Sequence, residues 1–194
     1  MKKVFACLAA VCVLAGAGFA AGGDPSESGI PTSPLKIWGS GVALGGFYPL
    51  SDVLKDSCGE FFGKVTWMNS FDFTENFALF LDINWYVDKD MENLKNFGVD
   101  AGGDYAFSPE SRVSPFLGGG VGMHYFGKKN KNEALAGLSL TARPGVALKL
   151  TGTVEVRVMA PFHFVLSETK DMGVGVQVGA MFFSNLRNIR SIDY

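Results

Sequence analysis

The feature of this sequence that most limits its possible folds is a two-residue alternation between apolar side chains and small or polar ones. In residues 172–183, every second residue is apolar, and the residues between them are mostly glycine. Such alternation is typical of a β-strand whose two faces meet different surroundings. The apolar positions are Met172, Val174, Val176, Val178, Ala180 and Phe182.

Seven further segments show the same period. Three of them alternate strictly, and four are less regular; the second of these has one polar residue, Asn69, on its apolar side. No segment with a helical period interrupts the series, so the sequence predicts eight strands. The strict segments are 77–88, 135–150 and 153–166, and the less regular ones are 36–48, 61–73, 97–107 and 113–126.

The connections between these segments alternate in length. Three short turns separate four longer and more charged loops. In an up-and-down arrangement, all the short turns then lie at one end and all the long loops at the other. This predicts an all-β fold: a closed, up-and-down, antiparallel eight-stranded β-barrel. The short turns are 74–76, 108–111 and 151–152, and the long loops are 49–60, 88–96, 127–133 and 167–171.

Composition indicates which face of the barrel points outward. Only 19% of the 194 residues are charged, 47% are hydrophobic, 25 are glycine, and the net charge is −2. No basic block is present, which argues against a nucleic-acid partner. A soluble barrel needs many charges on its exterior, whereas the less apolar face here is mostly Gly, Ala, Ser and Thr. Such small residues suit the narrow interior of an eight-stranded barrel. We therefore expect a transmembrane barrel; the alternative is a soluble, secreted lipid-binding barrel.

Aromatic residues gather near the ends of the predicted strands. Rings at these positions suit the two membrane–water interfaces, where they form girdles around a barrel. The residues are Trp38, Tyr48, Phe61, Phe73, Phe77, Trp85, Phe107, Tyr125, Phe164 and Phe182.

The N-terminus has the layout of a secretory signal peptide. Two lysines precede an apolar stretch that runs into small residues, and cleavage is expected after Ala20. An uncleaved transmembrane helix over 4–23 is the alternative. We expect a signal peptide at 1–20, a flexible lead at 21–35, the barrel domain at 36–184 and a tail at 185–194. Cleavage leaves Cys58 as the only cysteine, which excludes an intrachain disulfide.

The glycine-rich segment Pro115–Gly122, the signal peptide and the eight alternating strands together resemble the small outer-membrane β-barrel proteins of Gram-negative bacteria, the OmpA/OmpX-like group. The resemblance covers residues 36–184. It implies a porin-like cell-envelope protein in outer-membrane lipid (phospholipid and lipopolysaccharide), with extracellular long loops and with periplasmic short turns and termini. Members usually end on an aromatic residue that serves as an assembly signal. Here either the Phe182–Phe183 pair or Tyr194 could take that role.

Nine charged residues fall on the inward face. Unpaired charges are costly in a medium of low dielectric, so we expect them to pair with one another, with Asp82 facing Arg157 across the lumen. A side-chain-filled, non-conducting lumen follows, since water-filled pores appear at about 16 or more strands; an ion path is the alternative. The nine are Lys64, Asp72, Asp82, Asp100, Asp104, Arg143, Lys149, Glu155 and Arg157.

The two histidines, His124 and His163, point inward near the loop ends of their strands. A lipid-modifying barrel enzyme would need a partner such as Ser167 or Glu168 beside one of them. However, Val165 stands where lipid A deacylases have the serine of a His-x-Ser arrangement. The spacing of the histidines also matches no metal-ligand pattern. We therefore expect no catalytic, metal-binding or cofactor-binding residues, and no enzyme.

The expected function is a structural or interaction role for a monomer. In the loops, the basic run 128–131 is the best-placed patch for lipopolysaccharide phosphates or a loop-mediated partner.

Overall fold

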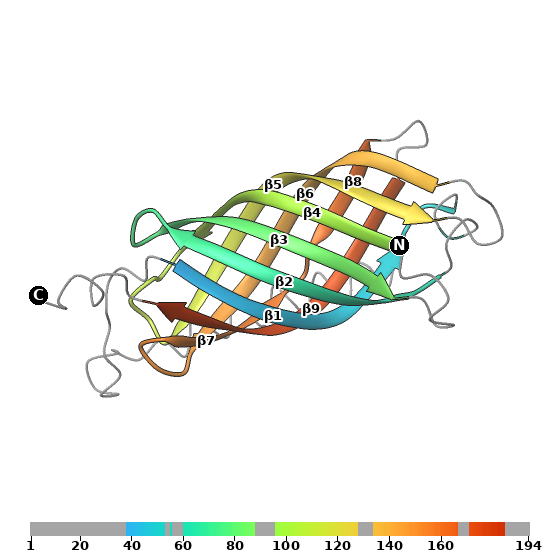
Figure 1. Cartoon of the computed structure of the whole chain (residues 1–194). Helices are drawn as coiled ribbons and strands as arrows, with labels where there is room; N and C mark the ends of the chain where they lie inside the picture. The colour runs from blue at the N-terminus through green and yellow to red at the C-terminus, as the bar shows by residue number, and fades with distance from the viewer. Residues whose placement is uncertain are drawn as a thin grey trace, which may run out of the picture.

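The computed structural model describes residues 38–52, 55, 60–87, 96–127, 134–166 and 171–184. The described residues form one antiparallel sheet that closes on itself, because the first strand pairs with the last (Figure 1). This confirms the predicted closed barrel. The strands are β1 (Trp38–Pro49), β2 (Phe62–Asp72), β3 (Phe77–Val87), β4 (Asn96–Ala106), β5 (Val113–Gly127), β6 (Ala134–Lys149), β7 (Val154–Met159), β8 (Phe162–Leu166) and β9 (Asp171–Ser184).

The predicted strand 153–166 is the one that the structure divides, into β7 and β8. The division falls at Ala160 and Pro161, and Pro161 has no backbone N–H to donate to the ladder. Both pieces lie between β6 and β9, and the register with β9 continues across the break, from Met159 opposite Gln177 to Phe162 opposite Val174. The barrel therefore has eight positions around its wall, and β7 and β8 share one of them.

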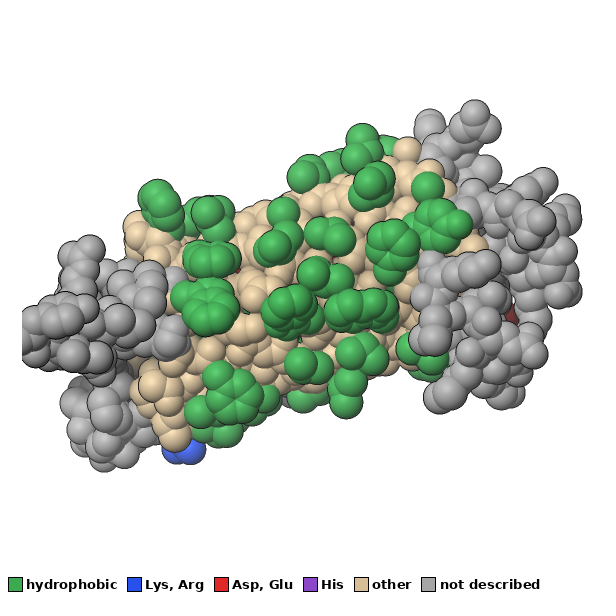
Figure 2. Space-filling model, in the orientation of Figure 1, with side chains coloured by type: hydrophobic (Ala, Val, Ile, Leu, Met, Phe, Trp, Pro, Cys, Tyr) green, Lys and Arg blue, Asp and Glu red, His purple; other side chains and the backbone are tan. Residues whose placement is uncertain are grey.

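The predicted faces are confirmed. On β9, Val176, Val178 and Phe182 are exposed, whereas Gln177 and Met181 are buried inside. Figure 2 shows hydrophobic side chains along the whole visible wall, with no charged side chain on the wall between its two ends. The ten aromatic residues expected near the strand ends are all exposed or half-buried, as lipid-facing rings should be.

All three short turns lie at the same end of the barrel, where β2 meets β3, β4 meets β5, and β6 meets β7 (Figure 1). Most of the four long connections fall outside the described residues, and so do Cys58, the basic run 128–131, Ser167 and Glu168. The expected signal peptide, the lead and the tail with Tyr194 also lie outside them. In the described part of the chain, no helix is both long enough and apolar enough to span a membrane.

Inward glycines make room for large side chains on neighbouring strands. Gly118 lies between Asp104 on β4 and Arg143 on β6 in the strand register. A Cβ atom at Gly118 would lie 2.1 Å from Asp104 Oδ1 and 2.6 Å from Arg143 Cγ. Gly122 separates Asp100 from Ser139 in the same way. Glycine thus lets residues two strands apart meet directly across the strand between them.

Two apolar clusters occupy the lumen with the polar groups. The cluster nearest the loop end consists of four rings packed against one another, for example Phe47 and Tyr86 with centroids 5.0 Å apart. Its members are Phe47, Phe62, Tyr86 and Phe126. The cluster toward the turn end consists of Ala43, Met68, Phe116, Ala147, Met159, Met181 and Phe183.

Candidate functional site: the polar side chains of the lumen

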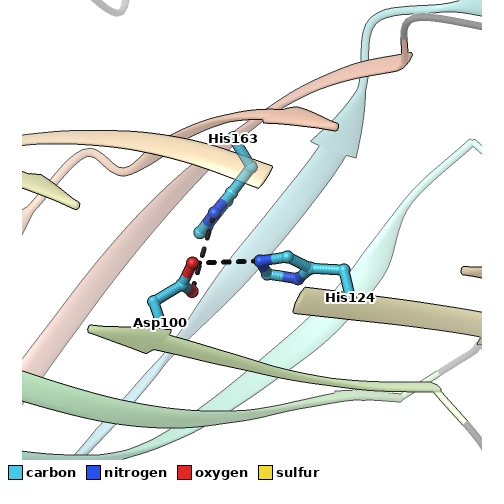
Figure 3. Close-up of side chains that lie close together, drawn as sticks. All are labelled: Asp100, His124 and His163. Atoms are coloured by element: carbon cyan, nitrogen blue, oxygen red, sulfur yellow. Dashed lines mark hydrogen bonds and ion pairs between the residues drawn. The ribbon is translucent and has the colours of Figure 1, made fainter. Parts of the chain in front are cut away.

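The first polar layer is centred on Asp100 of β4. Its Oδ1 accepts from Thr141 Oγ1 at 2.7 Å and contacts His124 Nε2 at 3.1 Å, while its Oδ2 accepts from Asn84 Nδ2 at 2.8 Å. His163 Nδ1 lies 3.7 Å from Oδ2. Figure 3 shows the carboxylate between the two imidazoles, which come from separate strands. The layer therefore joins β3, β4, β5, β6 and β8 through one buried carboxylate.

The donors and acceptors in this layer assign the tautomers of both histidines. An ammonium group can only donate, so Lys64 Nζ, 3.0 Å from His163 Nε2, requires a lone pair on that nitrogen. His163 then carries its proton on Nδ1 and donates to Thr141 Oγ1 at 3.1 Å. His124 donates from Nε2 to Asp100 and accepts from Tyr86 OH on Nδ1 at 2.9 Å. All these roles agree when Lys64 and Asp100 are charged and both imidazoles are neutral.

These hydrogen bonds also bear on whether Asp100 and the two histidines could hold a metal ion. Asp100, His124 and His163 place one ligand atom each within 4.8 Å of one another, and all three residues are buried. The three residue types fit a metal ion. A metal, however, would need a lone pair on each of the imidazole nitrogens that face Asp100, where the hydrogen-bond pattern places protons. Binding would displace these protons, and the His163 proton would then move to Nε2, where it would face the Lys64 ammonium 3.0 Å away. This conflict opposes a resident metal at the three residues, and we derive no chemistry through one.

The second polar layer is centred on Arg143 of β6. Its guanidinium forms ion pairs with Asp82 and Asp104 through separate nitrogens, and its Nε donates to Asp104 Oδ1 at 2.7 Å. The ring of Phe80 lies against the guanidinium, with 3.3 Å from Cζ to the ring centroid. A bidentate arginine with carboxylates on both sides is a strong buried arrangement, because the planar group matches the carboxylate oxygens.

Arg157 extends this layer toward the turn end. Its Nε donates to Glu155 Oε1 at 2.7 Å, and its Nη1 lies 3.5 Å from Asp104 Oδ2. The rings of Phe116 and Phe183 lie 5.5 Å and 5.9 Å from its Cζ. Two arginines and three carboxylates thus form one connected network across the lumen.

The expected pair between Asp82 and Arg157 is wrong. Arg143 takes the place beside Asp82, and Arg157 lies with Glu155 and Asp104. Alternation gives the face of each residue but not its height along the barrel, which depends on the stagger between strands. Seven of the nine predicted inward charges are buried, and Asp72 and Lys149 are half-buried near the turn end. Mutual pairing itself is confirmed at Asp82, Asp104, Arg143, Glu155 and Arg157.

Both histidines point inward as predicted, but their meeting at Asp100 was missed, as were the roles of Thr141, Tyr86 and Asn84. Each of these residues stands at an alternate strand position whose side chain faces the lumen. That position was the one sign in the sequence that they could take part in the site.

Two polar side chains on or near the outer wall also find partners. Trp67 Nε1 donates to Ser40 Oγ at 2.8 Å, and Asn69 Nδ2 donates to the Leu81 carbonyl oxygen at 3.3 Å. These bonds satisfy donors that hydrocarbon could not. They explain how Asn69 is tolerated on an otherwise apolar face.

The short-turn end of the lumen contains a cavity of about 460 Å³, which we call the vestibule. Its inner part is lined by Asp104, Glu155 and Arg157 of the second polar layer. Its outer part is lined by residues of the two turns, including Glu75 and Glu110. The second polar layer therefore separates the vestibule from the rest of the lumen.

The fold and this interior are those of a small transmembrane β-barrel with eight strand positions. Solved structures with the same fold include Neisserial surface protein A (TM-score 0.59, 11% identity, covering 76% of this chain and 96% of that chain). The N-terminal β-barrel domain of OprF from Pseudomonas aeruginosa matches with a TM-score of 0.53 and 13% identity, covering 74% of this chain and 97% of that one. OprG from the same organism matches with a TM-score of 0.53 and 10% identity, covering 78% and 99%. No family model matches the sequence, and no curated protein matches it either.

Proposed function

We propose that this chain is an integral outer-membrane β-barrel protein with a structural or interaction role and a side-chain-filled, non-conducting lumen. The observation that carries the proposal is the placement of side chains, which is the reverse of that in a water-soluble protein: hydrophobic groups lie outside and polar groups inside. Among the described residues, 27 large hydrophobic side chains are exposed on the outside, and 18 polar or charged residues are buried. A soluble lipid carrier would need the opposite, because its outer wall would face water.

The two polar layers support the non-conducting lumen. Arg143 and Arg157 bind carboxylates from several strands, so these side chains occupy the cross-section that an ion would need. Eight strands leave an interior just wide enough for side chains. An ion would have to break buried charge pairs to pass, at a cost of several kcal/mol.

Planar-bilayer recording tests this part of the proposal. The folded protein should give no steady channels, while a 16-stranded porin inserted under the same conditions serves as the positive control. Insertion of the test protein is verified separately by its resistance to protease in vesicles made from the same lipid. Large, stable conductance steps from the purified protein would overturn the non-conducting lumen.

The absence of enzymatic activity is part of the proposal. His124 and His163 are 1% and 3% exposed, and both are bound within the Asp100 layer. A lipid substrate in the bilayer would have no path to either ring. Mass spectrometry of the envelope lipids tests this. If His124→Ala or His163→Ala abolished a lipid modification, the protein would be a lipid-modifying barrel enzyme, and the proposed absence of activity would be wrong.

We further propose removal of residues 1–20, extracellular long loops, and periplasmic short turns and termini. Outer-membrane lipid surrounds the wall of the barrel. A protein partner would bind at the long loops. Cys58, in a predicted long loop, is a natural reporter: a membrane-impermeant maleimide should label it on intact cells. A C58S/E110C variant, which moves the thiol to a short turn, should be labelled only after the outer membrane is opened. The reverse pattern would contradict the orientation, and N-terminal sequencing tests cleavage after Ala20.

A further inference from the structure

The vestibule has properties that a plugged lumen does not require. Its volume of about 460 Å³ lies within the range of small-molecule sites, roughly 300–1,000 Å³. Its wall combines residues of the β2–β3 and β4–β5 turns with the strand residues beneath them. It is therefore a built concavity at one end of the barrel.

The charge of the vestibule favours a cation. Five carboxylates and two basic groups line it, which gives a formal charge of −3. Two of the lining carboxylates are already paired, Glu155 with Arg157 and Asp104 with Arg143, which lies behind the wall, and the Lys149 ammonium donates to the Pro109 carbonyl oxygen. With Arg143 included, the formal charge is −2 and still favours a cation. A concave site with walls of low dielectric concentrates such a field. The carboxylates belong to Asp72, Glu75, Asp104, Glu110 and Glu155, and the basic groups to Lys149 and Arg157.

One buried polar atom in the vestibule wall lacks a partner. Ser114 lines the vestibule and is 3% exposed, and among the described residues its Oγ has no hydrogen-bond partner. Buried hydroxyl groups are normally hydrogen-bonded, so an unpartnered one calls for an explanation. A bound donor group, such as an ammonium, would supply the missing partner.

The arrangement of the carboxylates favours an extended organic cation over a metal ion. In the described part of the chain, the one group of three residues that could chelate a metal is Asp100, His124 and His163, which lies outside the vestibule. The vestibule carboxylates are thus spread along its wall. Between them, Phe116 and Phe183 provide apolar surface that suits methylene groups.

We propose that the vestibule binds a linear polyamine-like cation, with ammonium groups at the carboxylates and with methylene chain against the phenylalanine rings. One ammonium donates to Ser114 Oγ and another lies at the mouth, near Glu75 and Glu110. This goes beyond the proposed function and does not depend on it. The second polar layer forms the inner wall of the vestibule, so a cation can bind on its turn-end side whether or not ions pass that layer.

The experiment is isothermal titration of spermidine into the purified, folded protein in a zwitterionic detergent. We expect saturable binding of one equivalent. The double variant E75Q/E110Q should bind about three- to tenfold more weakly, since each exposed charge pair contributes modestly. Both residues are exposed, so the variant should fold. D52N/E60Q, which also removes two exposed carboxylates but at the loop end, is the matched control and should bind like the wild type.

Two further measurements locate the site inside the vestibule. Ser114→Leu fills part of the cavity and should abolish binding; if that variant fails to fold, the double variant still decides the question. Magnesium chloride at matched ionic strength should weaken binding only as much as sodium chloride does. Absence of spermidine binding, equal affinity in wild type and E75Q/E110Q, or stoichiometric displacement by magnesium would each overturn the proposal.

Discussion

Replacing Gly118 by alanine should destabilise the barrel far more than the same replacement one residue later. The added Cβ would lie 2.1 Å from Asp104 Oδ1 and 2.6 Å from Arg143 Cγ, well inside contact distance. At Gly119, which faces outward, the nearest atom to an added Cβ is the Thr141 carbonyl oxygen at 3.8 Å, an ordinary contact. Neither glycine has a positive φ, so the backbone accepts alanine at both positions.

The expected size of the effect follows from these contacts. Relieving the clash at Gly118 means moving the Asp104 carboxylate and breaking its 2.7 Å bond with Arg143 Nε, and a bond between charged groups contributes about 1.5–3 kcal/mol. Overpacking of the surroundings adds about 1–3 kcal/mol, and alanine's lower conformational entropy returns about 0.5–1 kcal/mol. We expect Gly118→Ala to lose about 1.5–5.5 kcal/mol of unfolding free energy. Gly119→Ala should remain within about 1 kcal/mol of the wild type.

The assay is reversible urea unfolding of the protein in lipid vesicles, followed by tryptophan fluorescence. The gap between the two midpoints, converted with the common m-value, gives the difference in unfolding free energy. Equal midpoints for the two variants would refute the idea that inward glycines exist to let side chains on flanking strands meet.

Three further predictions concern the interior, the outer wall and metal binding. Arg143→Met leaves Asp82 and Asp104 without its guanidinium and should cost about 3–5 kcal/mol in the same unfolding assay; a loss under 1 kcal/mol would contradict the central role of this ion network. Val121→Arg places a charge on an exposed position near the middle of β5 and should cost about 2–4 kcal/mol in vesicles, whereas a neutral effect would indicate that this wall faces water. Adding a chelator should leave the unfolding midpoint unchanged, because hydrogen bonds already occupy Asp100, His124 and His163; a clear drop would reveal a bound metal.

The wall of the barrel was predictable from the sequence because its cause is local. Lipid on one side and a narrow lumen on the other impose a two-residue period on every strand, so the faces of residues such as Val178 and Gln177 follow from parity. The break at Pro161 could not have been predicted from proline alone, since Pro115 and Pro144 lie inside the unbroken strands β5 and β6. The inward rings of Phe47 and Phe126, by contrast, could have been predicted, because they share the parity of the inward-facing residues around them.

The contacts inside the lumen were not predictable in the same way. Which residues meet there depends on strand stagger and on side-chain reach, and neither leaves a mark in the alternation. Arg143 reaches Asp104 only because Gly118 stands between them, and His163 meets Asp100 only because β8 pairs with β6 in one particular register. A sequence pattern can predict that buried charges pair, but the register decides the partners.

The central claim, a closed barrel that spans a membrane, is tested most directly by heat modifiability. The purified protein, folded in detergent, is run on a denaturing gel with and without boiling, next to a sample kept in urea and never folded. We predict that the unboiled folded sample migrates at a different position from the boiled one, and that the urea sample migrates with the boiled one. A single position for all three samples, under conditions where a known barrel protein shifts, would contradict the closed barrel.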